Sequence, residues 1–380
     1  MSTFEKAQII WKNFLNHKIL EYGFKRNYDY GPDKQSAVSK ISPFVSHRIL
    51  FEFKLIKEII NKYESSAVNK YIEELYWRIY WKGWLENNPC LWEHFVSIKT
   101  QDFDEDLYQK ALDAETHLTY FNSWIKELKE FNYLHNHTRM WFASTWIFNL
   151  GLPWELGAKL FFEHLYDGDA ASNLLSWRWV AGLHTKGKRY FFTPDNLRKF
   201  SNNRFFVRSI NNKDIKLKDQ FHIFSSEDIF NSDMNQKSDE LLIFENDLHI
   251  NSLRDFLKKY KSVYLILLGN KDRNITLSKN VMHFKKRIIM EFIQVFPQIK
   301  FLTSNEFLLF SDKNKRFDLL YPSVGENYHF IKKNKIKKGL TIHNLVREPD
   351  IFAWHYAKKG FFKFKKNIPI INEFIKDIKI

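Results

Sequence analysis

The stretch from Tyr133 to Phe192 constrains the fold of this chain most, because polar side chains interrupt an otherwise apolar run with helical periodicity. The segment HNHTRM supplies Asn136 and Arg139, and the turn Asp167-Gly168-Asp169 adds two carboxylates. Buried polar groups of this kind must be hydrogen-bonded. The stretch therefore indicates either a bound partner molecule or a dense internal network inside a helical fold.

Four fragments of this region follow one another in a set order: HNHTRM at 135–140, Trp154, DGDAASN at 167–173 and WRW at 177–179. Together they closely resemble the FAD-binding domain of the photolyase and cryptochrome family, and the resemblance extends from about Tyr22 to Phe192. It is closest to bacterial proteins like the cyclobutane pyrimidine dimer photolyases. The resemblance implies a mainly α-helical domain that binds FAD, and it leaves open a second, antenna chromophore.

The net charge of the chain is strongly positive, at +15 with a pI near 9.4. A basic protein favours a polyanionic partner such as DNA, whose phosphates release counterions when they are neutralised. A lysine-rich composition from an AT-biased genome explains the charge equally well, so both interpretations stay open. The high content of Trp, Tyr and Phe also supplies faces on which flavins and bases stack.

Several classes of protein are disfavoured by the sequence. The single cysteine, Cys90, excludes an internal disulfide and a cysteine-based metal cluster, and no metal site is expected. Residues 1–8 lack the pattern of a signal peptide, and the longest apolar runs are too short to span a bilayer. We expect a soluble, cytoplasmic monomer that makes no membrane contact.

The segment VSKISP at 38–43 resembles the family's TSxLSPxL segment, in which hydroxyls and backbone amides surround the FAD pyrophosphate. Ser39 and Ser42 keep hydroxyls at these places, Lys40 takes the place of a basic residue, and Val38 lacks the hydroxyl. Amides at a helix N-terminus attract phosphate without any family argument. A capped helix start without a ligand is the alternative.

Other flavin contacts are implied by the resemblance alone. Asn136 and Arg139 would lie against the flavin, with Arg139 paired to Asp167. Asn173 would face flavin N5 and Asp169 the ribityl chain or the ring, although an Asp-Gly-Asp turn also suits an Asx turn and a helix N-cap. The expected cofactor-binding set is Tyr22, Ser39, Lys40, Ser42, Tyr71, Asn136, Arg139, Asp167, Asp169 and Asn173.

A helix is predicted over residues 68–86, where Glu74 lies three residues before Trp77 and on the same face. The stretch matches the family helix that lines the substrate cavity, although an aromatic stripe at this spacing is also typical of a core. Related enzymes for the (6-4) photoproduct carry histidines at the places of Asn136 and Met140, so this chain favours cyclobutane dimers. The resemblance implies that the dimer is hydrogen-bonded by Glu74 and Asn136, stacked on Trp77 and Trp179, and contacted by Met140.

Contacts with DNA are implied for Arg26 and His137, beside the stacking rings of Trp77 and Trp179. Arg26 keeps the spacing of the family's Tyr-x-x-x-Arg pattern with Tyr22, although a solvated surface charge is the alternative. His137 replaces a residue that is often arginine in the family, and this change would weaken one phosphate contact.

An electron relay is also implied, with Trp177 nearest the flavin and Trp154 in the middle place. No tryptophan lies between Glu93 and Ser123, where the family's surface-terminal relay tryptophan belongs. The residue that ends the relay therefore stays open among several tyrosines, Trp92, Trp141 and Trp146.

The order of predicted elements divides the chain into a helical domain at 1–201, a polar connector at 202–240 and a smaller α/β domain with a C-terminal tail at 241–380. Short apolar strands alternate with helices in the last part, which is typical of a parallel, Rossmann-like sheet. This part carries neither GxGxxG nor a P-loop, and its architecture resembles the family's antenna-type domain, which normally precedes the flavin domain. Helices are predicted at 3–22, 252–260 and 280–296, and strands at 241–245, 263–268, 299–303 and 317–320.

The tail at 348–369 combines Trp354, His355 and Lys359 with paired phenylalanines. Two interpretations stay open for it: a surface that faces DNA or the other domain, or a packed C-terminal tail. Its spacing does not decide between them.

The sequence predicts a light-dependent DNA-repair flavoprotein, similar to deoxyribodipyrimidine photolyases. Reduced FAD, excited by blue or near-UV light, would pass one electron to a flipped-out cyclobutane pyrimidine dimer, and the electron would return after the ring splits. The alternative is a cryptochrome-like blue-light photoreceptor without repair, and a third option is a FAD-binding remnant with a basic, DNA-binding surface. The intact set of Glu74, Trp77, Met140 and Trp179 favours repair, since a photoreceptor has no need of a dimer cavity.

Overall fold

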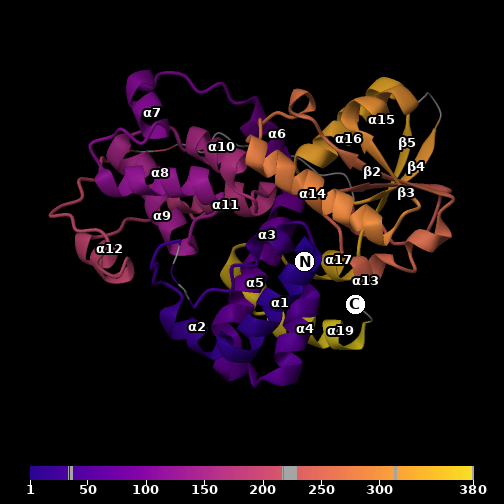
Figure 1. Ribbon diagram of the computed structural model, residues 1–380, viewed down its shortest axis with the longest axis horizontal. Helices are drawn as coiled ribbons and strands as arrows, with labels where there is room; N and C mark the ends of the chain where they lie inside the picture. Colours follow the sequence, from indigo (N-terminus) through magenta and orange to yellow (C-terminus); the bar gives the residue numbers. More distant parts are fainter. Residues whose placement is uncertain (33, 35–36, 216, 218–228, 312–314, 379–380) are drawn as a thin grey trace.

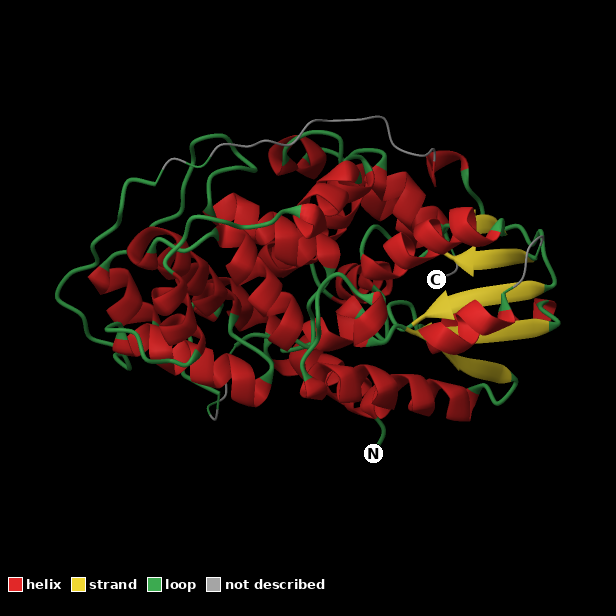
Figure 2. Ribbon diagram, turned by 90° about the horizontal axis from the view of Figure 1, so that it is seen from above, coloured by secondary structure: helices red, strands yellow, loops and turns green. Residues whose placement is uncertain are grey.

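The computed structural model describes residues 1–32, 34, 37–215, 217, 229–311 and 315–378 and shows a large helical region beside a small parallel sheet. The helices fill the left and the bottom of the view in Figure 1, and the sheet lies at the upper right. Figure 2 shows the strands side by side at one end of the molecule, pointing the same way. The predicted fold class is confirmed. The domain boundaries stay a prediction, and part of the expected connector lies outside the described residues.

The helical region is built from helices whose ends follow local sequence signals. Ser2 and Glu5 form a capping box at the first helix, and Asn132 ends the eighth in the left-handed conformation at φ 53°. The helix expected over 3–22 is divided at Lys18, whose backbone leaves the helical conformation. The helices are α1 (Thr3–His17), α2 (Ile19–Lys25), α3 (Ser42–Ser46), α4 (Glu52–Lys62), α5 (Ser65–Glu86), α6 (Cys90–Ser97), α7 (Glu105–Leu112), α8 (Thr119–Phe131), α9 (Asn136–Ser144), the π-helical turn η1 (Thr145–Leu150), α10 (Trp154–His164), α11 (Ala170–Val180) and α12 (Pro194–Phe200).

The C-terminal helices α17 (Glu348–Trp354), α18 (Phe361–Lys365) and α19 (Ile368–Asp377) pack against α4 and α5 of the helical region. Gly83 of α5 makes this approach feasible, because a Cβ atom there would lie 2.6 Å from Cδ1 and 2.8 Å from Cα of Trp354. Trp354 is 1% exposed. The tail is therefore a packed segment, as one of the two interpretations expected, and it covers the helical region rather than the sheet.

The sheet has five parallel strands in the order β3-β2-β1-β4-β5. Its strands read as continuous apolar runs because helices cover both faces. The strand at 341–345 was not expected, and the helix expected at 252–260 is wrong, since only α13 and a short 3-10 turn form there. The elements are η2 (Ile229–Asn231), β1 (Glu240–Phe244), α13 (Ile250–Leu253), η3 (Leu257–Lys259), β2 (Ser262–Leu267), η4 (Asn270–Asp272), α14 (Lys279–Val295), β3 (Ile299–Thr303), α15 (Ser304–Phe310), β4 (Arg316–Leu320), α16 (Glu326–Lys338) and β5 (Thr341–Leu345).

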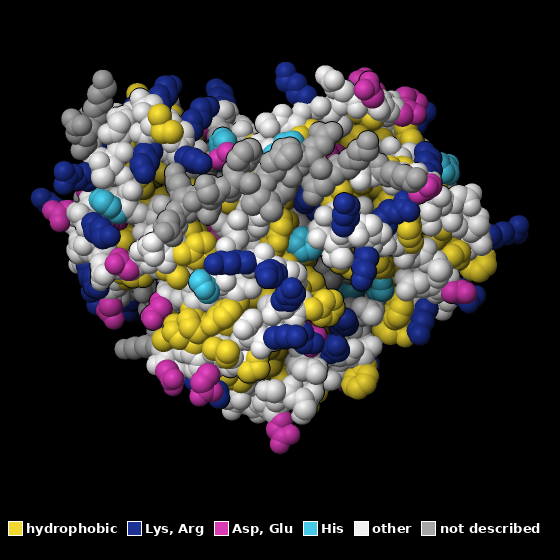
Figure 3. Space-filling view, turned by 180° about the vertical axis from the view of Figure 1, so that it is seen from behind, with side chains coloured by type: hydrophobic (Ala, Val, Ile, Leu, Met, Phe, Trp, Pro, Cys, Tyr) yellow, Lys and Arg dark blue, Asp and Glu magenta, His cyan; other side chains and the backbone are white. Residues whose placement is uncertain are grey.

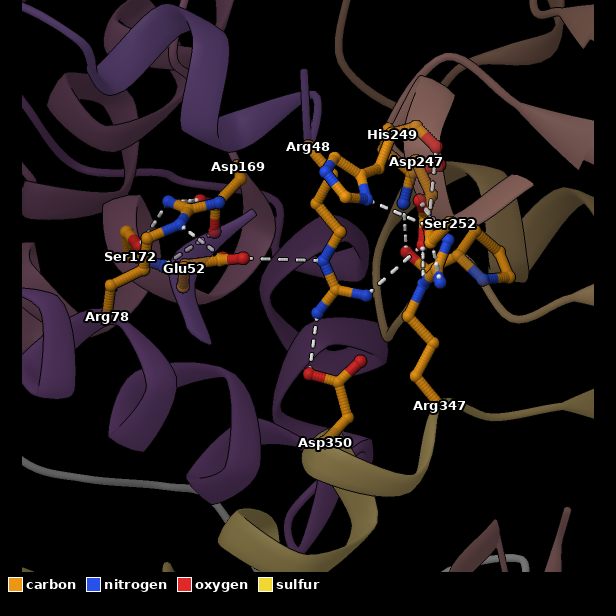
Figure 4. Close-up of polar contacts among 12 residues, drawn as sticks. Arg48, Glu52, Arg78, Asp169, Ser172, Asp247, His249, Ser252, Arg347 and Asp350 are labelled. Atoms are coloured by element: carbon orange, nitrogen blue, oxygen red, sulfur yellow. Dashed lines mark hydrogen bonds and ion pairs between the residues drawn. The ribbon is translucent and has the colours of Figure 1, made fainter. Parts of the chain in front are cut away.

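A buried network of ion pairs joins the helical region to the sheet and to the C-terminal helices (Figure 4). Arg48, which follows α3, lies 3.2 Å from Asp247 beyond β1 and 2.6 Å from Asp350 of α17. Arg347 pairs with Asp247 at 2.8 Å, and all four side chains are at least nine-tenths buried. Three segments far apart in the sequence are thus held together by buried ion pairs.

Among the described residues, no helix has the length and apolar character needed to cross a membrane.

Candidate functional site

A cavity of about 680 Å³ lies within the helical region, between α2, the segment before α3, α5, α9 and α11. Its size is within the range of small-molecule and cofactor pockets. Nearly all of the site residues expected from the sequence meet in this one space. They are Tyr22, Arg26, Ser39, Lys40, Ser42, Tyr71, Glu74, Trp77, Asn136, His137, Arg139, Met140, Asp167, Asn173, Trp177 and Trp179.

Arg139 and Asp167 form the pair that the sequence predicts. The guanidinium of Arg139 donates to both carboxylate oxygens of Asp167, at 3.0 and 2.9 Å, and its Nε donates to the carbonyl of Leu134 at 2.9 Å. Asp167 is 7% exposed. A bidentate pair of this kind fixes the plane of the guanidinium, which leaves Arg139 rigidly placed at the cavity wall.

Asp169 is not among the residues that line this cavity, and its expected contact with the flavin stays a prediction. Its Oδ1 accepts from the backbone N–H of Ser172 as the N-cap of α11, and its Oδ2 pairs with Arg78. The carboxylate lines a separate crevice of about 90 Å³ between the helical region and the sheet. The capping role that was the alternative for this turn is confirmed, and Arg78 holds the other carboxylate oxygen.

Glu74 and Arg26 face one another across the cavity as an ion pair. Each side chain is about one-third exposed, at 30% and 32%. Burial raises the pKa of Glu74, and Arg26 opposes that shift. Arg26 is therefore not a freely solvated charge, since it lies where it holds and orients the carboxyl group of Glu74.

Two tryptophans form walls of the cavity. The ring of Trp77 is stacked on Phe361 of α18, with centroids 3.6 Å apart and an interplanar angle of 11°. Trp179 lies 5.6 Å from Tyr190, which also lines the cavity. Sequence reasoning missed both supporting rings, although the paired phenylalanines of the tail were a visible signal for Phe361. The C-terminal tail thus supports a wall of the cavity from behind.

Comparison with known proteins identifies this arrangement. Residues 71–214 match the family model described as the FAD binding domain of DNA photolyase. Over these residues the chain is similar to the photolyase and cryptochrome family. FAD is the cofactor that this similarity supports, and the resemblance noted in the sequence is confirmed.

The similar proteins include both photolyases and a cryptochrome. A deoxyribodipyrimidine photo-lyase of Buchnera aphidicola is 29% identical, over 50% of this chain and 42% of its own length. A cryptochrome DASH of Natronomonas pharaonis is 27% identical, over 50% of this chain and 41% of its own length. A class III photolyase structure from Agrobacterium tumefaciens is 23% identical with a TM-score of 0.43, over 52% of this chain and 42% of that one. The chain spans less than half the length of these relatives.

The polar groups on the wall of the FAD-binding domain fit a flavin nucleotide. Tyr71 donates its hydroxyl to Ser39 at 3.0 Å, so two of the expected contact residues support one another. Lys40 takes the left-handed backbone conformation at φ 53°, which turns the chain just before α3. Asn173 uses its Nδ2 to donate to the carbonyl of Ala158 at 2.8 Å, which leaves its Oδ1 for another partner. Cations, hydroxyls and amides are the groups that hold a pyrophosphate and a flavin ring.

His137 lines the cavity but is largely buried. It is 5% exposed, its Nδ1 donates to the carbonyl of Asn27 at 2.9 Å, and the hydroxyl of Tyr190 lies 3.4 Å from its Nε2. Burial lowers the pKa of His137. The expected contact with a DNA phosphate stays a prediction.

The aromatic rings near Trp177 offer a path other than the expected one. Trp177 packs edge-on against Trp146 at 6.4 Å, and Trp146 against the partly exposed Tyr108 at 5.9 Å. Trp154 does not line the cavity and stacks instead on Phe95 at 5.7 Å. Of the termini left open by the sequence, Trp146 with Tyr108 leads from the cavity toward the surface.

Proposed function

We propose that this protein is a light-dependent DNA-repair flavoprotein that splits cyclobutane pyrimidine dimers. The observation that carries the proposal is the convergence of two sets of residues on one cavity. The cofactor set around Arg139, Asp167 and Asn173 and the substrate set of Glu74, Trp77, Asn136, Met140 and Trp179 line the same space. Relatives named deoxyribodipyrimidine photo-lyase support the same reading.

When bound, FAD supplies the light-driven electron transfer, and the protein binds and orients the reactants. Ser39, Lys40 and Ser42 would hold the pyrophosphate, and Arg139, fixed by Asp167, would contact the flavin. Trp77 and Trp179 hold the dimer between aromatic faces. Burial raises the pKa of Glu74, and its carboxyl group lines the cavity where it is placed to hydrogen-bond a pyrimidine.

A blue-light photoreceptor that binds FAD without repair is the second candidate. It is favoured by one observation from the comparisons, the match to a cryptochrome DASH, and by one from the sequence, the lack of a tryptophan at 93–123. Both functions need the flavin site, but only repair needs the residues proposed to bind the dimer. An assay with dimer-containing DNA therefore distinguishes the two functions.

The deciding experiment is illumination of chemically reduced protein with DNA that contains thymine dimers, beside a dark control. Chemical reduction bypasses the electron relay, so a defective relay does not obscure the result. We expect chromatography to show dimers restored to thymines in the light only. Protein that carries reduced FAD and splits no dimer would contradict the repair function and favour the photoreceptor.

Replacing Trp179 with alanine is expected to weaken binding of dimer-containing DNA roughly tenfold or more, because stacking is worth about 1–3 kcal/mol per base. Undamaged DNA, held through its phosphates, should bind as before. Trp84→Ala, a tryptophan of α5 that does not line the cavity, is the matched control. Equal losses in the two variants, measured by fluorescence anisotropy, would remove Trp179 from the substrate site.

Replacing Glu74 with alanine should lower the yield of repair rather than the affinity for DNA. Its hydrogen bond is expected to matter most to the reduced dimer, so dimer binding should stay close to wild type while the yield of repair per absorbed photon falls. Glu74→Gln, which keeps a hydrogen-bond donor, should recover part of that yield. A variant that loses binding and yield in parallel would assign Glu74 to general substrate binding instead.

A further inference from the structure

The exposed charges on one face of the protein are largely cationic. Figure 3 shows Lys and Arg side chains across the middle of this face, with acidic side chains mainly toward its margins. Water and salt screen such surface charges, so their number alone does not define a binding site. A buried cation without a partner is more informative, because burying an unpaired charge is costly unless a ligand compensates for it.

Lys82 of α5 is such a cation. It is 7% exposed and lines the crevice of about 90 Å³ between the helical region and the sheet. Within the described part of the chain it donates no hydrogen bond and forms no ion pair. Burial lowers the pKa of Lys82, and the two carboxylates that oppose this shift, Glu52 and Asp350, are already paired with Arg48. Lys82 thus lies in a polar space with its positive charge unpaired.

Arg273 brings a second donor without a partner to the same crevice. Its side chain is 4% exposed, and its Nη2 makes no hydrogen bond, although Oε1 of Glu245 lies 3.5 Å away. Arg78 also has a buried Nη2 without a hydrogen bond, but this residue lines the larger cavity of the helical region as well. The unpartnered donors that line the crevice and not the larger cavity are therefore Lys82 and Arg273.

The carboxylates of the crevice are already held by other groups of the protein. Glu245 accepts from Lys285 at 3.0 Å, and Glu86 accepts from the hydroxyl of Tyr321 at 2.7 Å and from the backbone N–H of Val324 at 2.9 Å. The other two cap α11 and hold backbone N–H groups of the loop after β2. The four carboxylates are Glu86, Asp169, Glu245 and Glu326. The charged groups that lack a hydrogen-bond partner in the crevice are thus cations.

The crevice lies at the carboxyl ends of the strands, where the order of the sheet changes direction. The chain passes from β1 to β2 and β3 on one side of the sheet and then crosses to β4 and β5 on the other. Glu245 directly follows β1 and the segment at 322–327 follows the neighbouring strand β4, and both line the crevice. Open parallel sheets bind ligands at this position. The topology therefore favours a ligand here independently of Lys82 and Arg273.

Two helices, α11 and α16, begin at the crevice. A Cβ atom on Gly325, which precedes α16, would lie 3.0 Å from Cβ of Ala170 at the start of α11, so the two N-termini are close together. Asp169 caps α11, whereas Gly325 offers α16 no side-chain cap. The first N–H groups of α16 are therefore left for another acceptor. The positive ends of both helix dipoles also favour an anion between them.

The size of the crevice limits which anion it can hold. Pockets for organic cofactors and drug-sized ligands measure about 300–1,000 Å³, whereas the crevice measures about 90 Å³. This space is too small to enclose a flavin or another chromophore, and it suits a tetrahedral oxyanion. A phosphate accepts several charge-assisted hydrogen bonds at once, which matches an ammonium, a guanidinium and a helix N-terminus.

We propose that the crevice binds a phosphate group, held by Lys82, Arg273 and the N-terminus of α16. This site goes beyond the repair function, because it requires neither DNA nor light. A phosphate bound there would join α5 to the loops after β2 and β4 and stabilise the contact between the helical region and the sheet. The phosphate is either the free ion or the ester of a small molecule whose remainder extends out of the crevice.

The test is titration of the FAD-loaded protein with inorganic phosphate by isothermal titration calorimetry, at an ionic strength kept constant with chloride. FAD is kept bound so that its own pyrophosphate site is filled. We expect a single saturable site in the wild-type protein. Lys82→Met and Arg273→Gln should each weaken phosphate binding by about tenfold to a hundredfold, because each removes a hydrogen bond to a charged group.

A parallel titration with glycerol phosphate distinguishes the two sources of the phosphate group. Tighter binding of the ester than of inorganic phosphate would assign the crevice to a phosphorylated small molecule, and weaker binding would assign it to the free ion. Either result supports the site, provided that Lys82→Met weakens it.

Urea unfolding gives a second measurement that is independent of the heat of binding. Without phosphate, Lys82→Met should be at least as stable as the wild type, because methionine removes an unpaired buried charge. Phosphate should then raise the urea midpoint of the wild type and leave that of Lys82→Met unchanged. Lys70→Met, which replaces a lysine of α5 whose side chain is 52% exposed, is the matched control and should respond to phosphate as the wild type does.

Three outcomes would overturn the proposal. Phosphate binding that is as tight in Lys82→Met as in the wild type would place the ion elsewhere. Folded wild-type protein that binds neither phosphate would show that the crevice holds only water. A Lys82→Met variant that is less stable than the wild type without phosphate would show that Lys82 is already compensated within the protein.

Discussion

Replacing Asp167 with alanine is expected to release FAD, lowering its affinity by about tenfold to a hundredfold. Asp167 holds both terminal nitrogens of Arg139, at 3.0 and 2.9 Å, and it is 7% exposed. Hydrogen bonds to charged groups contribute about 1.5–3 kcal/mol. When Arg139 is no longer held by Asp167, we expect the binding free energy of FAD to become weaker by a similar amount. The absorption of purified protein near the flavin bands measures the bound fraction, and titration of the apoprotein with FAD measures the affinity.

Two further variants separate this effect from general destabilisation. Asp167→Asn keeps one acceptor for Arg139 and should lose less affinity than Asp167→Ala. Asp195→Ala removes an exposed carboxylate of α12, which among the described residues forms an ion pair with Arg198, and should retain FAD in full. If Asp167→Ala folds and carries FAD at the wild-type level, the placement of the cofactor against Arg139 is wrong.

Replacing Arg48 with methionine is expected to destabilise the folded protein by about 3–5 kcal/mol, because it leaves buried carboxylates without their partner. Arg48 is 3% exposed and contacts Glu52, Asp247 and Asp350. Among the described ion pairs, Asp350 takes part only in the one with Arg48, whereas Asp247 keeps Arg347. The expected result is a lower urea midpoint at an unchanged m-value.

A second substitution tests whether the unpaired charge is the cause. Arg48→Met combined with Asp350→Leu removes both members of the pair and should be more stable than Arg48→Met alone, since no carboxylate remains orphaned at that position. Lys110→Met, which breaks an exposed pair with Asp106, should leave the midpoint in place. Equal midpoints for the single and the double variant would show that lost packing, not charge, controls stability here.

The parts of the candidate site that lie in short sequence motifs could be predicted from the sequence. HNHTRM and DGDAASN carry the family resemblance that implied the pairing of Arg139 with Asp167, and the structure shows that pair. Glu74 and Trp77 share a helix face by their spacing alone. The role of Asp169 was open in the sequence, and only the structure shows that its carboxylate caps α11 and pairs with Arg78.

The sequence by itself determined the class of the fold and the alternation of strands and helices, because periodicity and caps are local properties of the chain. The FAD-binding set stays a prediction. The tertiary structure alone decided which distant segments support the site. Phe361 behind Trp77 and Arg48 between Asp247 and Asp350 both depend on residues that lie one hundred or more positions apart. Contacts of this kind arise from packing around α5, where Gly83 lets α17 approach closely. A local sequence pattern does not show which distant segment will pack against a given helix face.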